Sequence, residues 1–167
     1  INAVPICLDT QDTEEIIKTV KNIAPAFGGI NLEDISAPRC FEIEERLKEM
    51  LDIPVFHDDQ HGTAIVVLAG IINGLRVTGK KKEDCKVVVN GAGSAGVAIT
   101  RLLLTYGFKD VTMCDKEGII GKDYPNLNWM QQKMTEVTNL SNRKGTLADA
   151  LKGADIFVGV SAPNIVT

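Results

Sequence analysis

Residues 86–96 read Lys-Val-Val-Val-Asn-Gly-Ala-Gly-Ser-Ala-Gly, a β-branched run that ends in a glycine turn. The residues that follow have helical spacing, so we predict a strand, the turn, and then a helix over residues 95–106. Gly91, Gly93 and Gly96 fit the G-x-G-x-x-G pattern, which alone is a weak signal. Between a strand and a helix it predicts a turn whose free N–H groups bind a pyrophosphate. The alternative is a glycine turn that only packs.

An acidic residue stands where this motif requires a partner. Asp115 follows a predicted strand over residues 111–114, and a carboxylate there accepts hydrogen bonds from the adenosine ribose. Its charge repels a 2′-phosphate, which favours NAD, while the adjacent Lys116 leaves NADP open. The residues expected to bind the cofactor on these grounds are Gly91, Ala92, Gly93, Ser94, Ala95, Gly96 and Asp115.

Short strand and helix patterns alternate along the whole chain. This alternation predicts an α/β fold with a doubly wound parallel sheet, that is, a Rossmann-like dinucleotide-binding domain preceded by part of another α/β unit. We place the metal- and substrate-binding segment at residues 1–78 and a truncated NAD(P)-binding domain at residues 79–167. The other strands are predicted over residues 4–8, 26–32, 54–56 and 156–160, and the other helices over residues 14–23, 63–75 and 129–137, with one more after Ser36 and a short one opened by Thr146 and Asp149.

Several local expectations follow from the same patterns. Ser36 is expected to cap the second helix, with Pro38 in its first turn. Glu44 and Lys48 are expected to form an i,i+4 pair on the solvent side of that helix. The helix over residues 63–75 is apolar nearly all round, so we expect it to be central in the fold.

Two pairs of acids each follow a predicted strand. Glu33 and Asp34 come after one strand, and Asp58 and Asp59 come after the next. The carboxyl ends of parallel strands meet at one edge of a sheet, where four carboxylates would repel one another without a cation. Oxygen donors select Mg²⁺ or Mn²⁺ over zinc, so we predict a divalent-metal site. The alternative is that these acids only cap helices.

His57 and His61 could suggest zinc, since they stand four residues apart. We expect them to straddle a turn rather than to share a helix face, and no third nitrogen or sulfur ligand stands near in the sequence. We therefore interpret them as hydrogen-bonding partners of the acidic loop.

Composition excludes several classes of function. The net charge of −4 over 167 residues disfavours binding to nucleic acid, and no run approaches the ~20 uninterrupted apolar residues of a membrane span. The four cysteines lack zinc or disulfide spacing, which indicates a reducing, cytoplasmic location. The chain starts at Ile1 and stops just after a strand pattern, so we expect it to be a segment of a larger protein.

Residues 27–41 (FGGINLEDISAPRCF) and 56–64 (FHDDQHGTA) carry a specific resemblance, which residues 91–96, Asp115 and 160–163 continue. In these stretches the chain resembles the malic enzymes, particularly their compact prokaryotic-type branch. The resemblance implies that Glu33, Asp34 and Asp59 are divalent-metal ligands. It also implies that Asp58 orients the catalytic lysine and that Thr63 lies near the cofactor or substrate crevice.

The resemblance also implies the reaction: oxidative decarboxylation of malate to pyruvate and carbon dioxide, with reduction of NAD(P) and a divalent ion acting as Lewis acid. In the family, the general base, a lysine, and the general acid, a tyrosine, come from a segment that precedes these residues. We therefore expect this segment alone to be inactive. We also expect the whole protein to act on a small molecule and to form a homodimer or higher homo-oligomer. Two alternatives stay open: another metal-assisted, NAD-dependent 2-hydroxy-acid dehydrogenase, and a non-catalytic dinucleotide-binding module.

Overall fold

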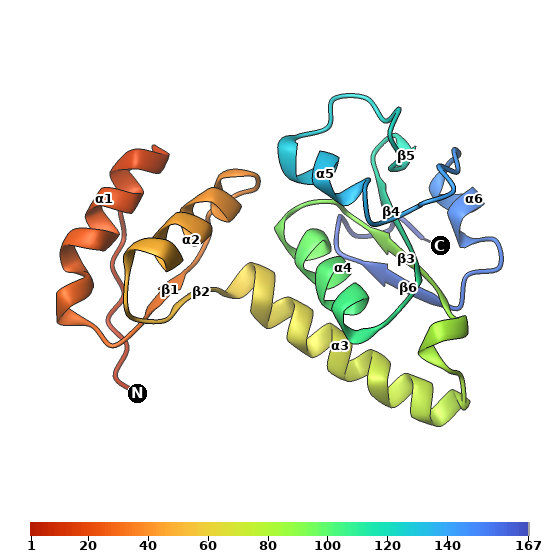
Figure 1. Cartoon of the computed structure of the whole chain (residues 1–167), viewed down its shortest axis with the longest axis horizontal. Coiled ribbons are helices and arrows are strands. Elements are labelled where there is room, and N and C mark those ends of the chain that lie inside the picture. Colours follow the sequence, from red (N-terminus) through yellow and green to blue (C-terminus); the bar gives the residue numbers. More distant parts are fainter. Residues whose placement is uncertain (167) are drawn as a thin grey trace.

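Two sheets organise the chain, one in each of two lobes (Figure 1). The computed structural model describes residues 1–166. The first lobe contains α1 (Thr13–Ile23), the 3-10 helix η1 (Ala24–Ala26), β1 (Ile30–Leu32), α2 (Arg39–Met50) and β2 (Val55–His57). The second lobe contains α3 (Asp58–Thr78), the 3-10 helix η2 (Lys82–Asp84), β3 (Lys86–Asn90), α4 (Ser94–Tyr106), β4 (Asp110–Asp115), β5 (Gly118–Ile119), α5 (Trp129–Met134), α6 (Leu147–Leu151) and β6 (Ile156–Gly159).

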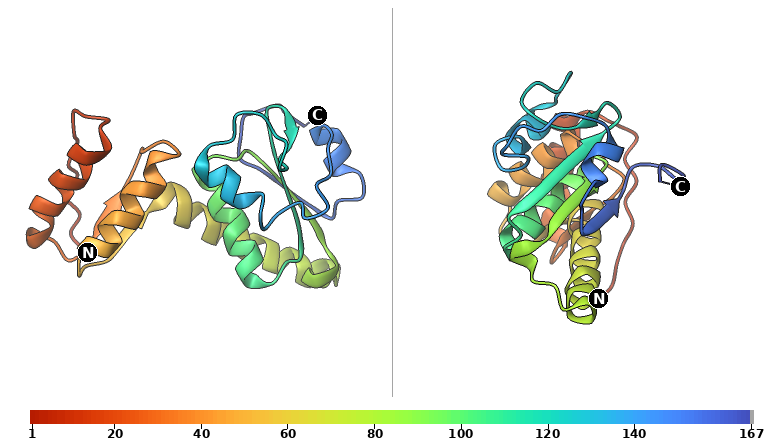
Figure 2. Two further views of the ribbon diagram at one scale, coloured as in Figure 1. Left: turned by 45° about the horizontal axis from the view of Figure 1, so that its top comes forward. Right: turned by 90° about the vertical axis from the view of Figure 1, so that its right-hand side faces the viewer.

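The four-stranded sheet of the second lobe has the order β5-β4-β3-β6, and β3 pairs in parallel with both β4 and β6. Because side chains alternate along a strand, Val87 and Val89 pack in the cluster that α3 and α4 cover, while Val88 packs with residues of α6. Helices therefore cover both faces of this sheet (Figure 2). The predicted α/β, doubly wound fold is confirmed.

One strand departs from the parallel prediction. β5 pairs antiparallel with β4, in the register Cys114↔Ile119 and Asp115↔Gly118. The hairpin needs Gly118 in a left-handed conformation, with φ of 103°, and a Cβ there would collide with the carbonyl oxygen of Gly145. The sheet is therefore mixed, with an antiparallel edge strand on a parallel core.

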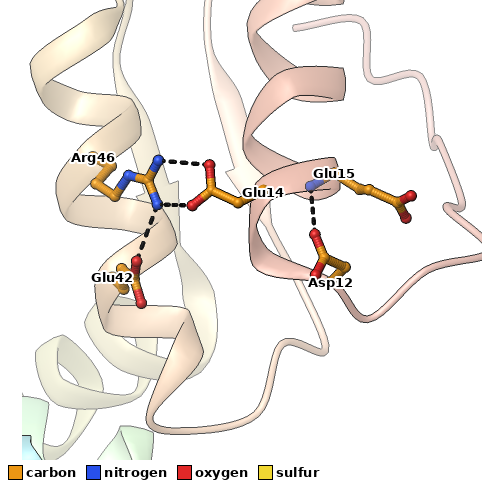
Figure 3. A network of polar contacts seen from close by, with 5 residues as sticks. All are labelled: Asp12, Glu14, Glu15, Glu42 and Arg46. Atoms are coloured by element: carbon orange, nitrogen blue, oxygen red, sulfur yellow. Dashed lines mark hydrogen bonds and ion pairs between the residues drawn. The ribbon is translucent and has the colours of Figure 1, made fainter.

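In the first lobe, β1 and β2 pair in parallel, with Leu32 opposite His57. An ion-pair network joins the two helices of this lobe (Figure 3). Arg46 of α2 donates both terminal nitrogens to the carboxylate of Glu14 in α1, at 2.5 and 2.9 Å, and also donates to Glu42 at 3.0 Å. This guanidinium lowers the pKa of Glu14. Asp12 caps α1 by accepting from the backbone N–H of Glu15 at 2.9 Å.

The prediction that residues 63–75 form a central helix was wrong in both extent and position. α3 begins five residues earlier, at Asp58, and it lies along the outside of the second lobe (Figure 1). One side packs against α4 and the sheet, while Ile65, Val66 and Val77 are between 56% and 87% exposed. α3 is long and apolar enough to cross a membrane by length and composition alone, a test that core helices of other proteins also pass.

Other local expectations were corrected. Residues 4–8 form no strand, since they lack a neighbouring strand to pair with, and their side chains are exposed. The strand predicted over residues 26–32 is confined to β1, because the chain first makes the 3-10 helix η1. α2 begins after Pro38 and has no side-chain cap, so Ser36 does not cap it. α5 ends at Met134, short of the predicted residue 137.

The remaining elements of the second lobe were predicted closely. β3, α4, β4 and β6 match their predicted ranges to within one residue at each end. The predicted capping box at α6 is present, with Thr146 and Asp149 bonded reciprocally. The boundary that we placed at residue 78 stays a prediction, although α3 packs physically with the second lobe.

Candidate cofactor and metal sites

The glycine turn has the geometry that phosphate binding requires. Gly91 adopts φ of 110°, and a Cβ there would meet the backbone of Val160 and Ser161 at 2.9–3.0 Å. A Cβ on Gly96 would collide with the carbonyl oxygen of Gly91, so the helix can approach the strand only with glycine here. A Cβ on Gly93 would meet nothing within 4 Å, which leaves open space beside the first turn of α4. That open space is where a pyrophosphate could reach the free N–H groups.

A cavity of about 490 Å³ opens at the carboxyl edge of the four-stranded sheet. The cavity is lined by Asn90, Asp115, Lys116, Glu117, Gly118, Thr146, Leu147, Ser161, Ala162 and Ile165. Asp115 is half-buried at the end of β4, and Asn90 donates to the hydroxyl of Ser161 at 2.8 Å. The carboxyl ends of parallel strands are where open α/β sheets bind ligands.

Sequence reasoning found Asp115 in this cavity but gave no cofactor role to Asn90, Gly118 or Thr146. Asn90 could have been found, because it is the last residue of the strand that precedes the glycine turn. Ser161 could also have been found, since it follows the last strand and β6 is the neighbour of β3. Gly118 lines the cavity because it lies in the antiparallel strand β5, and Thr146 lines it because it caps α6. Neither feature is recognisable in the sequence as part of a cofactor site.

The predicted metal ligands lie at one edge of the first-lobe sheet. Because Leu32 pairs with His57, Glu33 and Asp58 are the first residues beyond the same edge. Glu33 accepts from the side-chain amide of Asn31 at 2.7 Å, and Asp34 is in the left-handed region with φ of 55°. Both are exposed, whereas Asp59 is half-buried in the first turn of α3.

Within residues 1–166, no three His, Cys, Asp or Glu side chains are close enough together to hold a metal ion. The donor chemistry nevertheless fits a hard cation, since all the candidate ligands are carboxylates. The metal role of Glu33, Asp34 and Asp59 therefore stays a prediction.

A buried cluster joins the acidic edge to the glycine turn. Cys40 and Phe41, at the start of α2, belong to the same cluster as Ala92 of the turn and Met113 of β4. Burial raises the pKa of the Cys40 thiol to about 11, and the negative charges of Glu44 and, less, of Asp59 add to this shift. Ile35, which follows Asp34 directly, packs against the same cluster, so the segment that carries Glu33 and Asp34 shares one packed region with the glycine turn.

The two histidines differ from expectation. Asp58 is helical, so His57 directly precedes α3, and His61 lies within that helix rather than beyond a turn. His57 is fully buried, and neither ring nitrogen has a hydrogen-bond partner within residues 1–166. His61 bonds through Nε2 to Glu44 of α2 at 2.6 Å instead of to the acids that follow β1 and β2.

This contact also corrects the position of Glu44. Its i,i+4 pair with Lys48 forms at 2.8 Å, but the Glu44 side chain is only 6% exposed because α3 covers it. The Glu44–His61 contact joins α2 to α3, one element from each lobe, beside a second cavity of about 510 Å³. That cavity contains none of the residues predicted to bind the cofactor or the metal.

Two further predicted residues lie on α3. The Asp58 carboxylate folds back over Gly62, where any Cβ would collide with it. Thr63 is half-buried and lines neither cavity. Their predicted roles, orienting a lysine and lining the crevice, stay predictions.

Gln131 contacts both the glycine turn and Asp115, the two predicted cofactor-binding features of the second lobe. Its side-chain nitrogen donates to the carbonyl oxygen of Ala92 at 3.2 Å and lies 3.4 Å from Oδ2 of Asp115. Its side-chain oxygen accepts from the backbone N–H of Asn128 at 3.1 Å, within the capping box of α5. The spacing of Asn128 and Gln131 could have predicted the capping box, but no sequence signal pointed to Ala92 and Asp115 as partners, because they are far away in the chain.

The strand, glycine turn, helix and acidic strand end together define a dinucleotide-binding α/β domain preceded by a small α/β unit. Residues 60–166 match the family model described as "Malic enzyme, NAD binding domain", and residues 7–48 match "Malic enzyme, N-terminal domain". The first match alone covers more than half of the chain. The chain belongs to the malic enzyme family.

Individual relatives agree with this assignment. The chain is 61% identical to the NAD-dependent malic enzyme of Geobacillus stearothermophilus, over 99% of this chain and 35% of that protein. It is 51% identical to the bifunctional malic/malolactic enzyme of Bacillus subtilis (strain 168), over 100% of this chain and 41% of that protein. The chain thus spans well under half the length of these curated relatives.

Solved structures support the same fold. The crystal structure of the NAD-dependent malic enzyme of Thermotoga maritima superposes with a TM-score of 0.96 at 50% identity, over 100% of this chain and 45% of that one. The malic enzyme of Entamoeba histolytica gives a TM-score of 0.93 at 38% identity, over 100% of this chain and 37% of that one.

Proposed function

We propose that the full-length protein catalyses the oxidative decarboxylation of malate to pyruvate and carbon dioxide, with NAD as the hydride acceptor and Mg²⁺ or Mn²⁺ bound at the acidic strand ends. One observation carries the proposal. Ile35, which follows Asp34 directly, packs against the buried cluster that contains both Cys40 of α2 and Ala92 of the glycine turn. A substrate held by the acidic edge would therefore lie near the cofactor end of the other lobe.

In this proposal the glycine turn binds the pyrophosphate through the first-turn N–H groups of α4, and Asp115 accepts hydrogen bonds from the ribose hydroxyls. Glu33, Asp34 and Asp59 would hold the ion, which when bound supplies a Lewis acid for the substrate oxygens. Asp58 stands beside these ligands at the first residue of α3. The acid and base that move protons would come from the part of the full-length protein outside residues 1–167.

We propose NAD rather than NADP because Asp115 lines the cleft and its negative charge opposes a 2′-phosphate. Lys116 lines the same cleft and would weaken that discrimination. The ratio of kcat/KM for the two cofactors, measured on the full-length protein, tests this preference. A ratio that favours NADP would contradict it.

The reaction is tested on the full-length protein with malate, NAD and Mn²⁺, by following NADH formation together with pyruvate release. We expect both products in equal amounts, and a loss of at least about 100-fold in kcat/KM for Asp59→Asn, since one metal ligand is removed. Asp52→Asn is the matched control, because Asp52 is an exposed acid in the turn before β2.

The same assay separates the alternatives. If malate is ignored and another 2-hydroxy acid reduces NAD in the presence of Mn²⁺, the protein is a different dehydrogenase. If NAD binds equally well with and without chelator and no hydroxy acid turns over, the protein is a binding module. Either result would reject the malate reaction.

Three further expectations are part of this proposal. We place the protein in a reducing cytoplasm, which is supported by three free cysteines that are buried in the fold, Cys40, Cys85 and Cys114. We also propose a homodimer or higher homo-oligomer, and no nucleic-acid or membrane partner. Light scattering of the full-length protein measures its oligomeric state, and the same measurement with lipid vesicles or with nucleic acid tests for those partners.

A further inference from the structure

We propose that Gln131 is a positioning residue for the dinucleotide, which holds the glycine turn and the ribose-binding acid at a fixed separation. This inference rests on the proposed cofactor site. It starts from the placement of the Gln131 side chain between the carbonyl of Ala92 and the carboxylate of Asp115.

The orientation of the Gln131 amide is set by its neighbours. Its oxygen faces the backbone N–H of Asn128, which can only donate. Its nitrogen faces the carbonyl of Ala92 and the carboxylate of Asp115, which can both only accept. A flipped amide would place its oxygen against two acceptors and its nitrogen against a donor, so all three contacts require the same amide orientation.

One nitrogen of Gln131 holds both the Ala92 carbonyl, which belongs to the glycine turn, and the Asp115 carboxylate, which would bind the ribose. Asp115 also accepts at Oδ1 from the backbone N–H of Lys116, at 3.0 Å. Each carboxylate oxygen has two lone pairs, so capacity for ribose hydroxyls remains after both contacts. The contacts fix the direction of the carboxylate, while Ala92 fixes the turn that would bind the pyrophosphate.

The capping box makes Gln131 a rigid spacer. The side-chain oxygen of Asn128 accepts from the backbone N–H groups of Met130 and Gln131, and the side-chain oxygen of Gln131 accepts from the backbone N–H of Asn128. Met130 and Met134 are buried in the cluster that contains Ala92. α5 is therefore anchored on both sides, and movement of Gln131 would move the two ends of the cofactor cleft relative to each other.

Substituting Gln131→Glu in the full-length protein tests the two contacts that the Gln131 nitrogen donates. The variant keeps an oxygen for Asn128 but loses both donated bonds and puts a second carboxylate beside Asp115. We expect the Kd for NAD, measured by calorimetry without malate, to rise about tenfold. At saturating NAD, kcat and the KM for malate should stay within twofold. Gln132→Glu is the matched control, since it places the same charge on the exposed next residue and should change the Kd less than twofold.

A double-mutant cycle separates positioning from a general structural effect. In an Asp115→Asn background both the native Gln131–Asp115 contact and the repulsion between two carboxylates are absent, so Gln131→Glu should raise the Kd less than threefold. Equal penalties in both backgrounds, or equal Kd values for the Gln131→Glu and Gln132→Glu variants, would overturn the inference. If Gln131→Glu does not fold, Gln131→Met adds no charge and should still raise the Kd threefold to tenfold; unchanged binding by that variant would overturn it.

The outcome for the wild-type protein keeps this test distinct from the proposed function. Wild-type protein that does not bind NAD would reject the cofactor site itself. Wild-type protein that binds NAD as tightly as both Gln131 variants would reject only the positioning role.

Discussion

The cofactor site makes its sharpest prediction at Gly93. Gly93 has φ of −85° and ψ of −161°, an extended conformation that alanine adopts without strain. A Cβ there would meet no heavy atom within 4 Å. Gly93→Ala should therefore leave the free energy of unfolding within about 1 kcal/mol of wild type, since the lower entropy of the unfolded chain and the weaker N-cap act in opposite directions.

Binding should respond very differently from stability. The added methyl group occupies the space through which a pyrophosphate would approach the first turn of α4. Losing one charge-assisted hydrogen bond costs roughly 1.5–3 kcal/mol, which corresponds to a rise of about 10- to 150-fold in the Kd for NAD. Calorimetric titration of the full-length variant with NAD, paired with urea denaturation, measures both quantities.

Gly96→Ala provides the opposite case. Its Cβ would collide with the backbone oxygen of Gly91, and no side-chain rotation can relieve that contact. We expect a loss of about 1–3 kcal/mol in the free energy of unfolding. A Gly93→Ala protein that binds NAD within threefold of wild type would refute the assignment of this turn to the pyrophosphate.

Three other predictions follow from single contacts. Glu44→Ala should lower the free energy of unfolding by about 1–3 kcal/mol, because its buried carboxylate bonds two side chains, whereas the exposed neighbour Glu45 should tolerate alanine; equal effects in urea denaturation would contradict this. Asp115→Ser should raise the NADP-to-NAD ratio of kcat/KM at least about tenfold, and an unchanged ratio would remove Asp115 from the ribose site. Iodoacetamide at pH 8 should modify exposed Cys7 and spare Cys40, whose pKa of about 11 leaves roughly one thiolate in a thousand; mass spectrometry that finds Cys40 labelled first would contradict its burial.

The second lobe was largely predictable from sequence because its signals are local. An apolar run, a glycine turn and an amphipathic helix follow one another within residues 86–106, and each element specifies the next. The capping box of α6 is equally local, since it needs only Thr146 and Asp149. The formation of such elements depends little on contacts with residues that are distant in the chain.

α3 was mispredicted because apolar composition does not tell which neighbours a helix has. Its second face is exposed in residues 1–166, so a helix that is apolar all round lies at the surface here. Its start was missed because His57 and His61 were expected to straddle a turn. The acids instead occupy the first turn of the helix, where negative charge is favourable.

The contacts that sequence could not provide are those between distant residues. Glu44 reads as a surface partner of Lys48, and only the packing of α3 over α2 buries it against His61. Gln131 bonds Ala92 and Asp115, which are 39 and 16 residues away in the chain. Periodicity and motif spacing carry no information about such pairs, because tertiary packing creates them.

The central claim is that the acids at the ends of β1 and β2 share one divalent ion. Anomalous difference density from crystals of the full-length protein soaked in Mn²⁺ tests this directly. We predict one peak within coordination distance of Glu33, Asp34 and Asp59, on the side that faces the glycine turn, and its loss in Asp59→Asn. Soaked crystals with no manganese between these strand ends, in a protein that still oxidises malate, would contradict the account.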